Sequence, residues 1–295
     1  MTRVVVTGAS GFIGRHLCPR LRGTGHDVFE TNSRFGDVGE EGTWRKIPSA
    51  DAVVHLAGKT FVPDSWRDPA AFIRCNLLGT VAALDYCRAH QARMVYLSSY
   101  LYGNPQSLPI PETAPLVATN PYALSKQLAE EACRFYARSY GVATTILRPF
   151  NIYGPGQSEA FLLPCIIRQV REGKTVSVKD LAPKRDYVHV DDLVDAIARC
   201  VDPQPRPGVF NIGSGRSHSV GELIEIVQRI QKTNLPVVAT GERRQDEIMD
   251  TVADVSQARS VLGWEPRRML AEGIASLLGE PRGTARASDP AGARV

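Results

Sequence analysis

Short segments that are apolar at every central position recur along this 295-residue chain, and amphipathic segments separate them. A strand of this kind is buried on both faces, as in a parallel sheet covered by helices on its two sides. The expected strands lie at residues 3–10, 26–31, 50–58, 92–99, 142–154 and 207–213. The expected helices lie at residues 11–25, 69–90, 120–140 and 190–201. The alternation predicts a doubly wound α/β fold.

A glycine-rich segment, TGASGFIG, joins the first expected strand to the first expected helix. Gly8 permits a tight turn, Gly11 lets the backbone approach a pyrophosphate, and Gly14 allows the helix to pack closely on the strand. The amides and the dipole at the start of the helix then favour the phosphate charge. Purely structural turns also contain such triplets, but the place between strand and helix indicates a dinucleotide site.

The composition is that of an ordinary globular protein, with 43% hydrophobic residues, 22% charged residues and a formal net charge of +4. The six cysteines form no C-x-x-C pair, so we expect thiols of a reducing compartment and no metal site. No segment approaches the roughly 20 apolar residues of a membrane span. We therefore expect a cytoplasmic protein that binds neither membrane nor nucleic acid, with a disordered tail at 281–295.

The spacing G-x-x-G-x-x-G and the following FIG resemble the extended branch of the short-chain dehydrogenase/reductase superfamily. That branch contains nucleotide-sugar epimerases, dehydratases and ketoreductases, and the resemblance extends to about Pro266. It implies an NAD(P)-binding Rossmann domain at 1–152 and about 183–213, and a smaller nucleotide-sugar-binding lobe at about 153–182 and 214–280. It also implies a homodimer, formed through a four-helix bundle by the helices around residues 70–90 and 121–140.

The segment TNPYALSK carries a tyrosine and a lysine four positions apart. Asn120 is a good N-cap and Pro121 suits the first helical position, so Tyr122 and Lys126 should lie on one helix face. A cation beside a phenol should lower the Tyr122 pKa from about 10. Such pairs are common on solvated helices, but this one matches the family motif Y-x-x-x-K. The resemblance implies that Tyr122 exchanges a proton with a sugar oxygen while hydride moves to or from the nicotinamide.

The segment YLSSYLYG follows an apolar strand, and strand ends of open α/β sheets are where ligands bind. The resemblance places the third catalytic residue at Ser98, four residues before the Tyr102-Gly103 pair. Ser99 takes this role if the register slips by one, and both serines could instead cap the strand end. In relatives that dehydrate sugars, an acid pair or a Glu follows this residue, where this chain has Ser99 and Tyr100. The resemblance therefore disfavours a dehydratase.

The stretch FETNSR, residues 29–34, covers the position where an NAD-binding chain carries a carboxylate for the adenosine ribose. Counted as in relatives, this position is Asn32, and Glu30 comes too early. Asn32 can still bind a 2′-hydroxyl, whereas Arg34 could pair with a 2′-phosphate. The stretch favours NADP(H) and leaves NAD(H) possible.

The resemblance also implies the remaining residues of both pockets. Asp37 would cap the adenine, His55 would be structural, and Asn76 would either lie at the cofactor or pack inside its helix. The expected cofactor-binding residues are Gly8, Ser10, Gly11, Phe12, Ile13, Gly14, Asn32, Ser33, Arg34, Asp37, Leu56, Ala57, Gly58, Asn76, Tyr122 and Lys126. The expected substrate-binding residues are Ser99, Tyr100, Asn151, Arg185, Arg244 and Glu247. Arg244 would pair with the diphosphate unless Arg243 and Arg244 are only a solvated charge run.

Three functions are compatible with these features. The first is an NADPH-dependent 4-ketoreductase of a nucleotide-linked 4-keto-6-deoxyhexose, in which Tyr122 supplies the proton. The second is an NAD-dependent nucleotide-sugar 4-epimerase, and the third is a dinucleotide sensor without catalysis. The complete set of Ser98, Tyr122 and Lys126 argues against the sensor. Arg34 and the short connection between the second and third strands favour the reductase.

Overall fold

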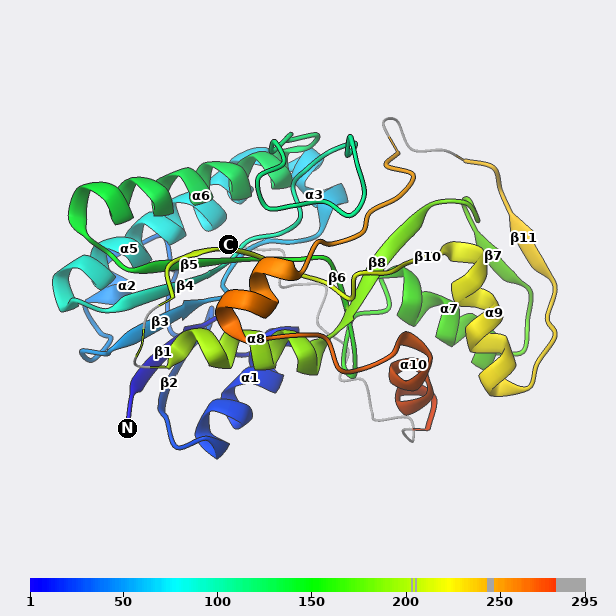
Figure 1. Ribbon diagram of the computed structural model, residues 1–295, viewed down its shortest axis with the longest axis horizontal. Coiled ribbons are helices and arrows are strands. Elements are labelled where there is room, and N and C mark those ends of the chain that lie inside the picture. Colours follow the sequence, from blue (N-terminus) through cyan, green and yellow to red (C-terminus); the bar gives the residue numbers. More distant parts are fainter. Residues whose placement is uncertain (203, 205, 243–246, 280–295) are drawn as a thin grey trace.

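The computed structural model describes residues 1–202, 204, 206–242 and 247–279, and its centre is a six-stranded sheet (Figure 1). The strands of this sheet are β1 (Arg3–Thr7), β2 (Asp27–Thr31), β3 (Ala52–His55), β4 (Arg93–Leu97), β5 (Thr144–Pro149) and β9 (Gly208–Ile212). They run parallel in the order β2-β1-β3-β4-β5-β9. The predicted doubly wound parallel sheet is confirmed.

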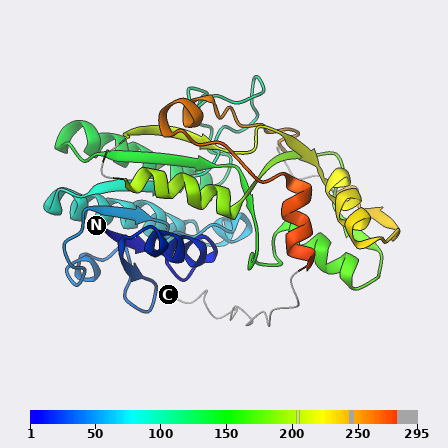
Figure 2. The same cartoon turned by 60° about the horizontal axis from the view of Figure 1, so that its bottom comes forward.

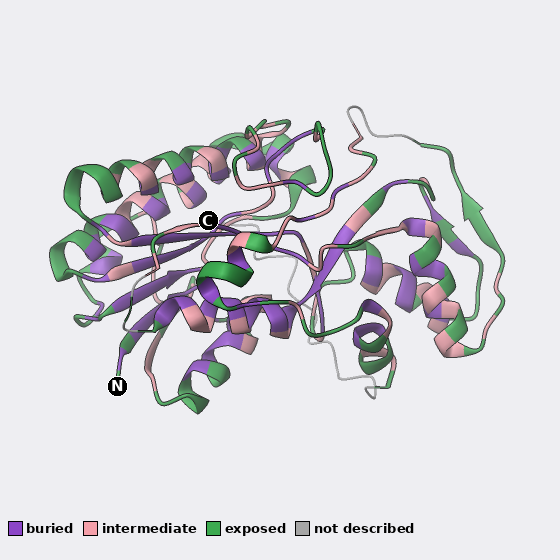
Figure 3. Ribbon diagram, in the orientation of Figure 1, coloured by how far each residue is buried: buried purple, intermediate pink, exposed green. Residues whose placement is uncertain are grey.

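Helices cover both faces of the sheet. The helices α1 (Phe12–Gly23) and α8 (Val190–Val201) pack on one face. The other face is covered by α5 (Gly79–His90), α6 (Pro121–Tyr140) and the short α2 (Glu41–Trp44). Figure 3 shows the inner strands buried between these layers and the outer sides of the helices exposed, whereas the edge strand β2 is only partly buried. This burial explains why the strand centres are apolar throughout.

The helix expected over residues 69–90 is interrupted in the structure. The helices α3 (Val62–Arg67) and α4 (Pro69–Phe72) precede a π-helical turn, η1 (Ile73–Leu78), and only then does α5 begin. Apolar periodicity does not separate a π-helical turn from an α-helix, because the turn differs by a single extra residue per hydrogen bond. Such turns often occur at functional sites, and this one contains the buried Asn76.

A second lobe lies beyond the carboxyl ends of the parallel strands (Figure 1, Figure 2). It contains the three-stranded sheet β10-β8-β6 and the two-stranded sheet β11-β7. These strands are β6 (Asn151–Tyr153), β7 (Val176–Val178), β8 (Lys184–His189), β10 (Ser217–Ser219) and β11 (Val237–Ala239). The lobe's helices α7 (Leu162–Arg171), α9 (Val220–Gln231) and α10 (Leu270–Gly279) share a hydrophobic core with these strands. The ends of the parallel strands therefore face a second body, as a ligand site in this fold requires.

The chain crosses between the lobes more often than the expected boundaries assume. The short helix η2 (Ala258–Leu262) and Trp264 pack in the core of the first lobe, although these residues fall within the range expected for the second. The indole Nε1 of Trp264 donates to the backbone oxygen of Asp192 at 2.8 Å. Conversely, Tyr187 of β8 belongs to the core of the second lobe. The tail expected at 281–295 lies outside the described residues.

Candidate active site

The glycine loop has the close packing that its spacing predicts. Gly8 has a φ of +68°, and a Cβ on it would lie 2.8 Å from the backbone nitrogen of Ala57. A Cβ on Gly14 would lie 2.5 Å from the backbone oxygen of Ala9. Gly11 precedes α1, and among the described residues no side chain caps this helix. The first amides of α1 can therefore bind a phosphate, and the loop fits a dinucleotide.

The stretch after β2 offers a cation at the adenosine end of the site. Glu30 forms an ion pair with Arg22 of α1 at 2.6 Å. The Asn32 Oδ1 accepts a hydrogen bond from the backbone N–H of Arg34 at 2.9 Å, which shapes the turn. The Arg34 side chain is exposed, and no carboxylate of the described chain pairs with it. The Asp37 side chain accepts from the Gly39 amide at 2.8 Å, so it also shapes this loop.

Tyr122 lies in the first turn of α6, which begins as predicted because the Asn120 side chain accepts from the Ala123 amide at 2.9 Å. Burial raises the pKa of Tyr122, and a hydrogen bond with the Ser99 hydroxyl opposes this shift. Ser98 is buried elsewhere, and its hydroxyl donates to Glu130 at 2.6 Å. The structure thus brings Ser99 to Tyr122 and directs Ser98 away, which favours the alternative register.

Lys126 is buried one helical turn after Tyr122. Its ammonium donates to the backbone oxygen of Leu97 at 2.7 Å and lies 4.8 Å from the centre of the Tyr96 ring. Burial lowers the pKa of Lys126 to about 8. The expected lowering of the Tyr122 pKa by Lys126 is wrong, because Lys126 points to the end of β4 and burial raises the Tyr122 pKa.

Asn76 and His55 hold the segment that follows β3. The Asn76 Oδ1 accepts from the Lys59 amide at 2.8 Å, and its Nδ2 donates to the Lys59 oxygen at 3.0 Å and to Ser125 at 2.8 Å. These bonds occupy the Asn76 amide, so the packing alternative describes it better than direct cofactor contact. His55 meets the Thr7 hydroxyl at 2.9 Å, and burial lowers its pKa to about 3. His55 is therefore neutral and structural, as expected.

The expected substrate residues form two groups. The Tyr100 ring stacks on Phe150 at 5.0 Å, and its hydroxyl donates to Asn151 Oδ1 at 3.3 Å. The Arg185 guanidinium donates to Glu247 at 2.5 Å and to the Ile248 oxygen at 2.6 Å. Arg244 lies outside the described residues.

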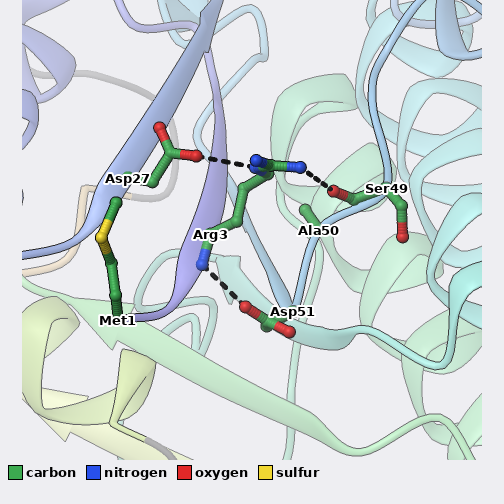
Figure 4. A pocket seen from close by; sticks show the side chains of 6 residues that line it. All are labelled: Met1, Arg3, Asp27, Ser49, Ala50 and Asp51. Atoms are coloured by element: carbon green, nitrogen blue, oxygen red, sulfur yellow. Dashed lines mark hydrogen bonds and ion pairs between the residues drawn. The ribbon is translucent and has the colours of Figure 1, made fainter.

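A cavity at the opposite edge of the sheet contains none of the expected site residues (Figure 4). Arg3, at the start of β1, donates to Asp27 and to Asp51, in both cases at 2.7 Å, and to the Ser49 oxygen at 3.3 Å. These groups satisfy one another where the strands begin, so the cavity is a structural feature of the amino edge. The dinucleotide loop and Tyr122 lie at the carboxyl edge.

Two buried charged residues near the site, Glu130 and Arg148, were not among the site residues predicted from the sequence. Both are buried side by side under the end of β4, with Arg148 Nη2 at 2.6 Å from Glu130 Oε2. The sequence did contain a signal, because Arg148 stands in the otherwise apolar segment ILRPF. A buried arginine requires an anionic partner, and Glu130 lies four residues after Lys126 on the same helix face.

Comparison with known proteins places the chain among enzymes of nucleotide sugars. The model of the "NAD dependent epimerase/dehydratase family" matches residues 4–213. The GDP-6-deoxy-D-mannose reductase of Pseudomonas aeruginosa is 32% identical, with 94% of this chain and 96% of that protein covered. A UDP-glucose 4-epimerase of Rhizobium leguminosarum bv. trifolii is also 32% identical, with 92% and 95% covered.

The solved structures agree with this comparison. RMD from Pseudomonas aeruginosa complexed with NADPH has a TM-score of 0.86 and 30% identity, and the match covers 94% of this chain and 98% of that one. The UDP-glucose 4-epimerase of Thermotoga maritima with UDP-glucose also has a TM-score of 0.86, at 28% identity, with 94% and 97% covered. The expectation of an NAD(P)-dependent enzyme is confirmed, and the chain belongs to the NAD dependent epimerase/dehydratase family.

Proposed function

We propose that this protein reduces the keto group of a nucleotide-linked 4-keto-6-deoxyhexose, with hydride from NADPH. The observation that carries the proposal is the position of Tyr122 in the first turn of α6, one helical turn before the buried Lys126, whose ammonium donates to the Leu97 oxygen at the carboxyl end of β4 at 2.7 Å. A general acid in this place can donate a proton to a keto oxygen. The raised pKa of Tyr122 suits reduction, because this direction starts from the protonated phenol.

NADPH supplies the hydride, and the chain supplies the acid and the orientation. Tyr122 donates its proton to the keto oxygen as the carbon becomes an alcohol carbon. The Ser99 hydroxyl donates a hydrogen bond to the same oxygen, and Tyr122 regains a proton from solvent. Lys126 would bind the ribose next to the nicotinamide and contribute a positive charge. The glycine loop would hold the pyrophosphate through the first amides of α1.

The choice of NADPH rests on the segment after β2. The exposed Arg34 guanidinium matches a 2′-phosphate, and Asn32 does not repel one. Glu30, which could bind a ribose diol, is already paired with Arg22. The similarity to a P. aeruginosa structure complexed with NADPH agrees with this choice.

For the substrate, we assign Tyr100 to the sugar, Asn151 to the diphosphate, and Arg185 and Glu247 to the nucleotide side. Arg185 lies where its fork can bind phosphate oxygens once its bond to Glu247 is exchanged. Arg244 stays a prediction for the diphosphate.

We also propose that the protein forms a homodimer, in which α5 and α6 of one protomer pack against α5 and α6 of the other. The outer face of α6 carries Leu124, Leu128 and Phe135, which are 45%, 38% and 48% exposed. An interface of helices would remove these side chains from water. No helix among the described residues is long and apolar enough to cross a membrane.

The second candidate is a nucleotide-sugar 4-epimerase that keeps NAD bound. It is favoured by the equal 32% identity of a UDP-glucose 4-epimerase and by the ability of Asn32 to bind a 2′-hydroxyl. A sensor without catalysis is disfavoured, because such a protein has no need of Ser99, Tyr122 and Lys126, which this chain carries.

The experiment that separates these functions measures cofactor use. The purified protein is mixed with NADPH or NADH and with GDP-, dTDP- or UDP-linked 4-keto-6-deoxyhexose. We expect stoichiometric loss of the absorbance of the reduced nicotinamide, fastest with NADPH. Co-purification with NAD, together with interconversion of UDP-hexoses without net cofactor use, would replace this proposal with the epimerase.

A further inference from the structure

The carboxylate of Glu130 is fully buried directly behind the proposed active site. It accepts four hydrogen bonds. Its Oε1 accepts from Ser98 Oγ at 2.6 Å and from Arg148 Nε at 2.9 Å. Its Oε2 accepts from Arg148 Nη2 at 2.6 Å and from Arg134 Nη2 at 2.7 Å. None of these groups touches the dinucleotide loop, so the proposed chemistry leaves this cluster without a role.

The serine that Glu130 binds stands between two groups of the active site. Leu97, before it, provides the oxygen for Lys126 at 2.7 Å, and Ser99, after it, lies near enough to Tyr122 to lower the pKa of that phenol. The backbone here is extended, because the amides of Ser98 and Tyr100 continue the ladder to β5. Consecutive side chains of an extended backbone point to opposite sides. Fixing the Ser98 hydroxyl on Glu130 therefore fixes the direction of Ser99.

The partner Arg148 connects the same cluster to the rest of the carboxyl edge. Its Nη1 donates to the Tyr102 hydroxyl and to the Glu112 oxygen, in both cases at 3.0 Å. The Tyr102 hydroxyl in turn donates to Asn211 of β9 at 2.5 Å. The segment from Ser98 to Tyr102 is thus held at both of its ends by one buried ion pair.

We propose that Glu130, paired with Arg148, is a positioning residue that selects Ser99 over Ser98 as the partner of Tyr122. This inference rests on the proposed function for its kinetic test only. Stability alone is a poor explanation for the pair, since buried ion pairs contribute little over well-packed apolar residues. The pair instead fixes which of two adjacent hydroxyls faces the reacting oxygen.

The test removes the hydrogen bond and leaves the ion pair. Glu130→Gln would leave the Arg148 charge unpaired in the interior and destabilise the fold, so the variant is Ser98→Ala. In Ser98→Ala we expect kcat to fall about tenfold, because the Ser99 hydroxyl is no longer held in its orientation toward Tyr122. The KM for the keto sugar and the Kd for NADPH should be nearly unchanged. Ser98→Thr, which restores a hydroxyl, should recover most of kcat. The control Thr144→Val removes another buried hydroxyl, one that bonds to the Val142 oxygen at 3.1 Å, and should leave kcat unchanged.

A second readout needs no substrate. The 13Cζ resonance of Tyr122, in protein labelled at tyrosine and assigned with Tyr122→Phe, responds to hydrogen bonding of the phenol. Ser98→Ala should move this resonance in the same direction as Ser99→Ala, and Thr144→Val should not move it. If the wild-type protein oxidises no NADPH, the proposed function fails while this readout still tests the position of Ser99.

Three results would overturn the inference. The first is an unchanged kcat and an unchanged Tyr122 resonance in Ser98→Ala. The second is a loss of kcat that is matched by equal losses in melting temperature and NADPH binding, since that is a purely structural role. The third is a loss above about a hundredfold in Ser98→Ala with near wild-type turnover in Ser99→Ala, which would make Ser98 the catalytic hydroxyl.

Discussion

The guanidinium of Arg22 lies 2.6 Å from the carboxylate of Glu30, so α1 binds the acid that precedes the ribose position. The loop that follows is left with Asn32 and an exposed Arg34. A phosphate that enters this loop meets one cation, and no carboxylate of the described chain competes for it. This arrangement makes the cofactor preference testable by a single substitution.

Arg34→Asp should reverse the preference. We expect NADPH to bind about ten to a hundredfold more weakly, because the phosphate loses a charge-assisted partner and gains a repulsive one. NADH should bind more tightly, through the new carboxylate and the 2′-hydroxyl. Titration of both cofactors by nicotinamide fluorescence measures the two constants. Arg45→Asp, at the exposed residue that follows α2, is the control for a general charge effect.

Tyr122→Phe should abolish turnover and spare cofactor binding. The phenol is the proton donor of the proposed reaction, and a positioned acid contributes about 10² to 10⁴ in rate. Steady-state kinetics, with NADPH binding measured in parallel, separates the two effects. Turnover within threefold of the wild type would contradict the assignment of Tyr122.

NADPH binding should weaken as the pH rises through about 8. Burial lowers the pKa of Lys126 from 10.5 to about 8, so its positive charge disappears above that pH. The contribution of Lys126 to the free energy of unfolding changes with pH in the opposite direction. Between about 8 and 10.5 the unfolded lysine binds a proton that the folded one has released, so this group adds stability as the pH rises. Binding isotherms from pH 6.5 to 9.5 check the prediction, and Lys126→Met should bind weakly at every pH.

Gly14→Ala should destabilise the fold, whereas Gly23→Ala in the same helix should not. The new Cβ at position 14 would lie 2.5 Å from the Ala9 oxygen and 2.6 Å from two further backbone atoms of that residue. Overpacking of this kind costs about 1–3 kcal/mol. A Cβ at position 23 meets nothing within 4 Å, and alanine is the better helix former there. Thermal unfolding of the two variants provides the comparison.

Leu128→Glu should dissociate the proposed dimer. The side chain is 38% exposed on the outer face of α6, and a buried carboxylate at a helical interface costs more than the interface gains. Sedimentation velocity at several concentrations reads the mass directly. Val237→Glu, at a position of β11 that is 39% exposed, should leave the mass unchanged. A monomeric wild type would refute the interface itself.

Most of the sheet could be predicted because its signal is local. Each strand of the six-stranded sheet is apolar at its centre, and each turn of the glycine loop is specified by residues that are adjacent in sequence. The start of α6 was predictable for the same reason, since Asn120 and Pro121 act within one turn. Such features depend on period and capping alone.

The directions in which the Ser98 and Ser99 side chains point were not predictable from their spacing. They depend on Glu130, 32 positions after Ser98, which binds the Ser98 hydroxyl in the folded chain, and on Arg148, 50 positions after Ser98, which binds Glu130. The pKa of Tyr122 was missed for a related reason. The helix places Lys126 on the same face, but the oxygen of Leu97 takes the ammonium, and burial then controls the phenol.

The return of the chain to the first lobe has a consequence for how this protein could be divided. Residues 4–213, which the family model matches, do not contain the indole of Trp264, and this indole is 2% exposed in the core over α8. A gene fragment that ends after β9 would leave that space open and the Asp192 oxygen without its donor. The dinucleotide-binding half is therefore not a cassette that can be exchanged between enzymes at its apparent border. A chimera has to include residues 251–264, or supply another apolar side chain that packs over α8 in place of Trp264.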